Sequence, residues 1–141
     1  MIFTRRDTLK LGAAGLVGLG ATTVVPFHAR AQDGGDSYDT DSGKITVHPI
    51  AHASFVMTVP GLVIYNDPVG GAEAYQGRPA PDLILITHEH GDHYNVETLE
   101  ALVQDGTRLI TNPAVFDMLP DDLKARATAI GNGQSTDIGA L

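Results

Sequence analysis

The sequence DLILITHEHGDHYN, residues 82–95, joins an apolar run to four potential metal ligands. The run DLILIT is continuous rather than alternating, which is typical of a strand buried on both faces. Four ligands follow within six positions: His88, His90, Asp92 and His93. A loop that lies between a buried strand and a helix is where open α/β sheets place their binding sites. We therefore take this stretch as the candidate site and the centre of the fold.

The spacing of the ligands favours metal binding. In extended backbone, residues two apart leave on the same side, so His88 and His90 can converge on one cation. Gly91 permits a sharp turn that aims Asp92 and His93 at a neighbouring position. Imidazole and carboxylate ligands suit zinc, and also manganese or iron(II), with one coordination place open for water. One or two such divalent ions would lower the pKa of bound water to about 7 and create a hydroxide nucleophile.

A solvated polar loop is the alternative interpretation, and it fits a lone histidine better than a group of four ligands. Glu89 points away from its neighbours under the same alternation, so we assign it to the surface or to the surroundings of the ligands. Outside the loop, His48 is interpreted as structural, and His28 falls in the N-terminal segment.

The first 31 residues resemble an export signal rather than part of the fold. Arg5 and Arg6 stand together, and an apolar, glycine-rich stretch follows at residues 11–27. Residues 28–31, HARA, then offer a small-x-small cleavage site. The pattern resembles a twin-arginine signal, so we predict a periplasmic or secreted protein without a stable membrane anchor after cleavage. An uncleaved anchor is the alternative, but about 17 weakly apolar residues are short for a membrane span.

Exchange of both Arg5 and Arg6 for lysine is expected to stop export, because the twin-arginine pattern depends on the arginine pair. The measurement is the fraction of the protein that reaches the periplasm, with Arg30→Lys as the control variant. Undiminished export of the double variant would show that the twin-arginine interpretation is wrong.

Composition indicates one ordinary domain with an acidic surface. The chain has 141 residues, of which 43% are hydrophobic and 18% charged, enough for a single core. It has no cysteine, which excludes disulfides, thiolate zinc sites and cysteine nucleophiles. Without residues 1–31, 5 basic and 16 acidic residues remain, a net charge of −11. Such a surface repels phosphate backbones, so we expect a small-molecule substrate and no nucleic acid.

The remaining chain divides into a linker and a layered domain. Residues 32–43 are polar, acidic and glycine-rich, which predicts a flexible linker. In residues 44–141, strands come first and then alternate with helices, the order of an α/β domain. The expected strands are residues 44–50, 54–59, 62–67, 82–87, 108–112 and 127–130, with a hairpin turn at Pro60–Gly61. The expected helices start after the caps Asn95 and Asn112 and end near residues 106 and 118, and residues 120–126 add a helical turn.

A known family shares the histidine motif. The segment THEHGDH, residues 87–93, resembles the His-x-His-x-Asp-His signature of the metallo-β-lactamase fold. Upstream, IAHASF (residues 50–55) and IYNDP (residues 64–68) resemble the opening strands of the branch that includes ascorbate-6-phosphate lactonase. The resemblance covers about residues 44–141. It implies the N-terminal half of a four-layer αββα sandwich, in a hydrolase that usually binds two metal ions.

The same resemblance implies roles for single residues. The metal ligands would be His88 and His90 for the first ion and Asp92 and His93 for the second. Asp92 would also act as the catalytic residue that helps to orient the hydroxide. Asp67 matches an acid that hydrogen-bonds metal-bound histidines, although an Asp that turns the chain before proline explains it equally on local chemistry. His52 matches a histidine near the cavity, and a hydrogen bond to the backbone would explain it nearly as well.

The family completes its site with downstream ligands, and no histidine follows His93 in this sequence. We therefore expect a truncated chain of about half the length of the complete sandwich. The predicted function is a metal-dependent hydrolase that uses metal-bound hydroxide on an ester, lactone, amide or phosphoester and is incomplete as this chain. A non-catalytic metal-binding or interaction fragment is the alternative. A homo-oligomer that completes the site between two chains also stays open.

Overall fold

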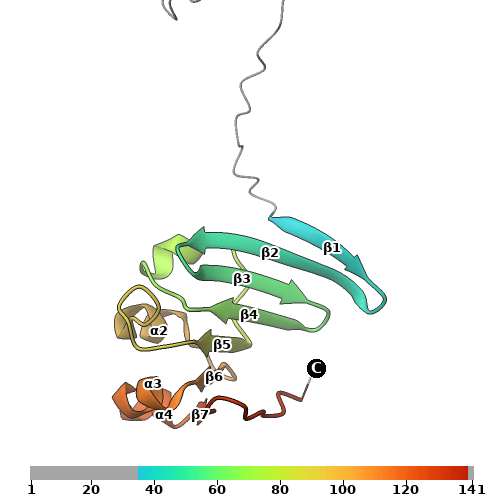
Figure 1. Ribbon diagram of the computed structural model, residues 1–141. Coiled ribbons are helices and arrows are strands. Elements are labelled where there is room, and N and C mark those ends of the chain that lie inside the picture. The colour runs from blue at the N-terminus through green and yellow to red at the C-terminus, as the bar shows by residue number, and fades with distance from the viewer. Residues whose placement is uncertain (1–34, 140–141) are drawn as a thin grey trace, which may run out of the picture. The chain divides into compact units, whose positions relative to one another are not determined.

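The computed structural model describes residues 35–139, so the predicted export signal lies outside the described residues. Within this part, seven strands form one sheet whose spatial order follows the sequence. The strands are β1 (Asp36–Thr40), β2 (Gly43–Ala51), β3 (Ser54–Val59), β4 (Leu62–Asn66), β5 (Leu83–Ile86), β6 (Arg108–Thr111) and β7 (Ala127–Ala129). Strands β1 to β4 pair antiparallel and β4 to β7 pair parallel (Figure 1). The α/β class predicted from the sequence is confirmed.

Helices occupy the crossovers between the parallel strands, where a hairpin cannot make the connection. They are the 3₁₀ helix η1 (Ala72–Tyr75) and the α-helices α2 (Val96–Leu102), α3 (Pro113–Met118) and α4 (Asp121–Lys124). Both predicted caps are confirmed. The Asn95 side chain accepts a hydrogen bond from the amide of Thr98, and the Asn112 side chain accepts one from the amide of Val115, each at 2.8 Å. None of the helices in residues 35–139 is long and apolar enough to cross a membrane.

The prediction of a flexible linker over residues 32–43 is wrong for its second half. Residues 36–40 form β1, which pairs with β2 from Asp36 opposite Val47 to Thr40 opposite Gly43. The hydroxyl of Thr40 donates to the Gly43 carbonyl at 2.6 Å and closes the turn. All five residues of β1 are exposed. Pairing with β2 therefore holds this strand although none of its residues is buried. A hydrophobic pattern in the sequence indicates burial, so it could not reveal β1.

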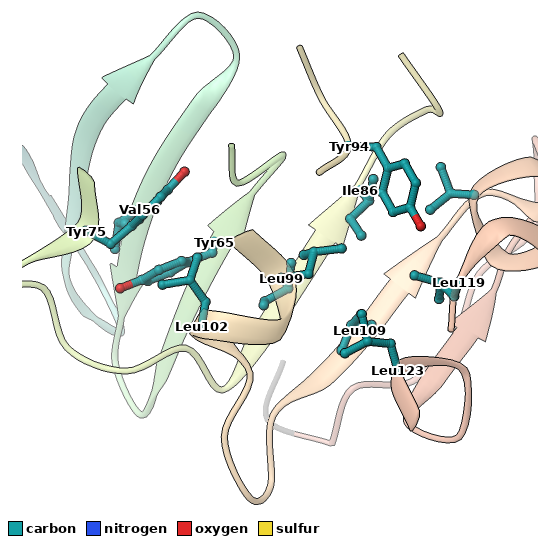
Figure 2. Close-up of a cluster of buried hydrophobic side chains, with 12 residues drawn as sticks. Val56, Tyr65, Tyr75, Ile86, Tyr94, Leu99, Leu102, Leu109, Leu119 and Leu123 are labelled. Carbon is teal, nitrogen blue, oxygen red and sulfur yellow. The ribbon is translucent and has the colours of Figure 1, made fainter. Parts of the chain in front are cut away.

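The larger core lies between one face of the sheet and the helices (Figure 2). Its buried residues are Val56, Tyr65, Tyr75, Ile84, Ile86, Tyr94, Leu99, Leu102, Leu109, Val115, Leu119 and Leu123. The rings of Tyr65 and Tyr75 stack with centroids 5.1 Å apart. Because Ile86 ends β5 and Leu99 is the fully buried centre of α2, this packing holds both ends of the loop that joins them.

A second apolar cluster lies on the opposite face of the sheet. Val59, Leu62, Ile64 and Leu83 are buried there. Ile138, in the C-terminal segment, packs against this cluster, and the Arg108 guanidinium donates a hydrogen bond to its carbonyl. Strand β5 therefore buries side chains on both faces, as its continuous apolar run predicted.

Candidate metal centre

Three segments meet at the end of β5. The loop of residues 87–95 leaves the C-terminal end of this parallel strand. Asp67, which directly follows β4, lies beside this loop. The amide of Asp67 donates to the Leu85 carbonyl at 2.8 Å. The third segment is the β2–β3 turn, where the His52 ring lies edge-on to the His93 ring with centroids 5.4 Å apart. All six residues singled out in the sequence are therefore neighbours: His52, Asp67, His88, His90, Asp92 and His93.

The potential ligands form two overlapping groups within the described residues. One ligand atom each from His88, His90 and Asp92 lies within 4.8 Å of the other two. The same holds for His52, Asp92 and His93. Asp92 belongs to both groups, so its carboxylate can serve either position or bridge the two. The rings of His88 and His93, one from each group, have centroids only 3.9 Å apart, so the two positions are adjacent.

Asp92 is exposed and ionised. The side chain keeps 56% of its accessible surface, whereas that of His93 keeps 16%. A hydrogen bond from its own backbone amide lowers the pKa of the Asp92 carboxyl. Desolvation opposes this shift, and the nearby imidazoles of His93, His52 and His90 lower the pKa further. The carboxylate form is the one that binds cations, so the residue is ready to act as a ligand at neutral pH.

Asp67 is the buried anchor of the centre, with 1% of its surface exposed. Its carboxylate accepts hydrogen bonds from the amide of Thr87 at 2.7 Å, the hydroxyl of Thr87 at 2.8 Å and the side-chain amide of Asn66 at 3.1 Å. It also lies 2.9 Å from Nδ1 of His93. Because a carboxylate can only accept, Nδ1 of His93 carries the proton and Nε2 is left free to bind a metal. Asp67 also has a positive φ of 42°, so it turns the chain as well.

Thr87 is a contributor that the sequence analysis missed. Its hydroxyl donates to Asp67 and lies 3.0 Å from Nδ1 of His88, from which it can accept. That hydrogen bond would leave Nε2 of His88 free for a metal. One buried carboxylate thus orients His93 directly and His88 through Thr87. The available signal was a hydroxyl residue that ends an apolar strand directly before the first histidine.

Two other residues of the sequence analysis lie outside both groups. Glu89 is exposed, and a hydrogen bond from its own backbone amide, followed by one from the Asn112 side chain, lowers the pKa of its carboxyl. His48 lies on β2, with Nδ1 3.0 Å from the guanidinium of Arg78. Burial and then the charge of Arg78 lower the pKa of His48, so the neutral ring accepts a hydrogen bond from Arg78.

Comparison with known proteins identifies the family. The model of the beta-lactamase superfamily domain matches residues 46–141. The chain belongs to the beta-lactamase superfamily. Its match to the UPF0173 protein of the archaeon Pyrococcus abyssi is 33% identical over 88 residues, which are 62% of this chain and 41% of that protein.

Two solved structures of metallo-hydrolase type are similar to this superfamily member. A predicted metal-dependent hydrolase from Parabacteroides distasonis has a TM-score of 0.60 and 33% identity, over 71% of this chain and 44% of that one. Igni18, a metallo hydrolase from Ignicoccus hospitalis, has a TM-score of 0.52 over 67% of this chain and 42% of its own, and its 21% identity supports the fold alone. The metallo-β-lactamase fold expected from the sequence is confirmed.

The chain spans 41% to 44% of the length of these relatives. Its described residues supply one sheet with helices on one face, which corresponds to one half of the four-layer sandwich. The imidazole nitrogens and the carboxylate oxygen at the end of β5 fit a divalent cation, because this donor set matches that of known zinc and iron(II) sites.

Proposed function

We propose that this chain carries metal-binding residues of a metal-dependent hydrolase, with His88, His90, Asp92 and His93 as ligands of one or two divalent ions. The observation that carries the proposal is the convergence of these side chains at the end of β5. Membership of the beta-lactamase superfamily and the likeness to metallo-hydrolases support metal-dependent hydrolysis in general. We propose zinc as the metal, and manganese and iron(II) also suit the donor set.

A divalent ion held by these residues would supply the nucleophile for hydrolysis, because it would lower the pKa of bound water to about 7. The residues of the chain position that chemistry. Asp67 and Thr87 hold the imidazoles of His93 and His88 with Nε2 free. The ionised, exposed carboxylate of Asp92 faces the same place and can accept a hydrogen bond that orients the attacking water.

We propose a small molecule with an ester, lactone, amide or phosphoester bond as the substrate. The exposure of His90 and Asp92 supports access from solvent to the metal side of the centre. The formal net charge of −8 argues against a nucleic-acid substrate, whose phosphates would be repelled.

The test measures bound metal and hydrolysis on the same sample of the purified full chain. Elemental mass spectrometry is expected to find about one or two zinc, manganese or iron ions per chain, together with turnover of a generic ester or a phosphodiester. The double variant His88→Ala/His90→Ala is expected to lose at least one ion per chain and the turnover, because two imidazoles leave one ligand group. His48→Ala is the matched control, since its ring bonds to Arg78 and belongs to neither group.

Unchanged metal content in the double variant would contradict the proposal. Metal that is bound without turnover would instead favour a non-catalytic metal-binding fragment. A hydrolysis rate per chain that rises with protein concentration would indicate that a second copy of the chain completes the site.

A further inference from the structure

His52 comes from a separate hairpin, yet its Nε2 lies 3.1 Å from the Asp92 carboxylate. We propose that His52 is itself a metal ligand, and that His52, Asp92 and His93 form a three-ligand position for a divalent ion. This inference rests on the proposed function, because it adds a ligand to the same metal centre. It goes beyond the proposed function in taking one ligand from the β2–β3 turn, outside the loop of residues 87–95.

The ligand atoms are spaced as a common cation requires. Bonds of about 2.0–2.1 Å in a tetrahedral zinc site place the ligand atoms about 3.3 Å from one another. The Asp92 oxygen is 3.1 Å from Nε2 of His52 and 3.7 Å from Nε2 of His93, on either side of that value. Two imidazole nitrogens and one carboxylate oxygen also leave a coordination place for water, as in catalytic zinc and iron(II) sites.

The backbone at His52 is strained. His52 and Asp67, with φ of 41° and 42°, are the two non-glycine residues with positive φ in the described part of the chain. Both lie at the metal centre. Left-handed backbone at non-glycine residues is kept where the surrounding structure enforces it, and it gathers at functional sites. A register shift between Pro49 and Ala51 in the pairing of β2 with β3 directly precedes the turn, a type of irregularity that redirects side chains.

Hydrogen bonds connect the β2–β3 turn, which carries His52, to Asn66 and Asp67. The hydroxyl of Ser54 donates to the carbonyl of Asp67 at 2.6 Å, and Ser54 is buried. The side-chain amide of Asn66 donates to the carbonyl of Ala53 at 3.1 Å. Both bonds fix the backbone directly after His52, which keeps the turn next to the segment that contains Asp67.

An ordinary ion pair between His52 and Asp92 is the rival explanation. The two side chains are 63% and 56% exposed, and ion pairs at such positions contribute little to stability. The positive φ of His52 fits the two-residue hairpin turn that joins β2 to β3, but a simple pair leaves the approach of the His93 ring unexplained. A shared cation accounts for the convergence of three side chains on one place.

The test uses His52→Gly in the full chain, because glycine removes the imidazole and also relieves the positive φ. Zinc is titrated into metal-free protein by calorimetry, and thermal unfolding of the metal-free protein is followed in parallel. We expect the variant to lose one ion per chain, or to bind it at least about 100-fold more weakly, given that outer contacts alone change metal affinity 10- to 100-fold. The midpoint of unfolding without metal should stay equal or rise. His52→Asn, which tolerates the same backbone, should lose the ion as well.

The outcomes separate this inference from the proposed function. If His52→Gly and His52→Asn bind zinc as the wild type does, while His88→Ala/His90→Ala loses an ion, His52 is only the partner of an ion pair and the inference is overturned. If the wild-type chain binds none of zinc, manganese and iron(II), both the inference and the proposed function fail. If the His52 variants lose an ion and His48→Ala loses none, His52 is a ligand.

Discussion

Replacement of Asp92 by asparagine is expected to abolish stoichiometric metal binding and hydrolysis together. Asp92 is the residue that both described ligand groups share, and its carboxylate is ionised. Asparagine keeps the size of the side chain but removes the negative charge, so both positions lose their anionic ligand. Residues that merely contact a metal ligand contribute about 10- to 100-fold to metal affinity or activity. Loss of a shared ligand should therefore exceed about 100-fold in both quantities.

Zinc titration calorimetry and an ester hydrolysis assay measure the two effects on one preparation. Glu89→Gln is the matched control, because it removes a neighbouring carboxylate that is exposed and belongs to neither ligand group. Its metal affinity and turnover should stay close to those of the wild type. An Asp92→Asn protein that still binds metal at full stoichiometry would show that the ligands lie elsewhere.

Asp67→Ala is expected to cause a large loss of stability as well as a loss of metal. The carboxylate is 1% exposed and interacts with donors on Thr87, Asn66 and His93. Each buried donor left without a partner costs about 1–3 kcal/mol. Removal of one partner from a buried charged network typically costs about 3–5 kcal/mol, which is the expected fall in the free energy of unfolding. Metal affinity should fall about 10- to 100-fold, because His93 and His88 lose their fixed orientation.

Asp67→Asn separates the two effects. The amide keeps the volume and one acceptor oxygen, so most of the stability should remain while the hold on Nδ1 of His93 weakens. Urea unfolding and zinc titration of both variants give the comparison. Wild-type stability of Asp67→Ala would mean that these hydrogen bonds do not hold the end of β4 to the loop after β5.

Local patterns predicted the parallel half of the sheet because each element there carries its own signal. The apolar run of β5 buries side chains on both faces, and Asn95 and Asn112 each cap a helix. These features depend on neighbours within four residues, which a sequence displays directly. Strand β1 offers no such signal, because every side chain in it is exposed and hydrogen bonds to its neighbour β2, rather than burial, hold it.

The candidate site was predictable as a set of residues but not as a network. The ligand spacing and the family resemblance singled out the loop, Asp67 and His52. The approach of His52 to Asp92 depends on how the β2–β3 turn sits beside a loop about 40 residues away, and alternation along a strand gives no information about what lies opposite. For Asp67, the two interpretations left open, a chain-turning residue and a partner of histidine, both hold.

The sequence order of the strands means that each strand of the sheet pairs with its neighbours in the sequence. The longest crossover, between β5 and β6, closes a loop of about 20 residues, so the entropic cost of each closure stays small and contacts stay local. The candidate ligands from His52 to His93 are all in place once the loop after β5 has docked, before α3, α4 and β7 are needed. We therefore expect a cation bound at that stage to stabilise the partly assembled sheet early in folding.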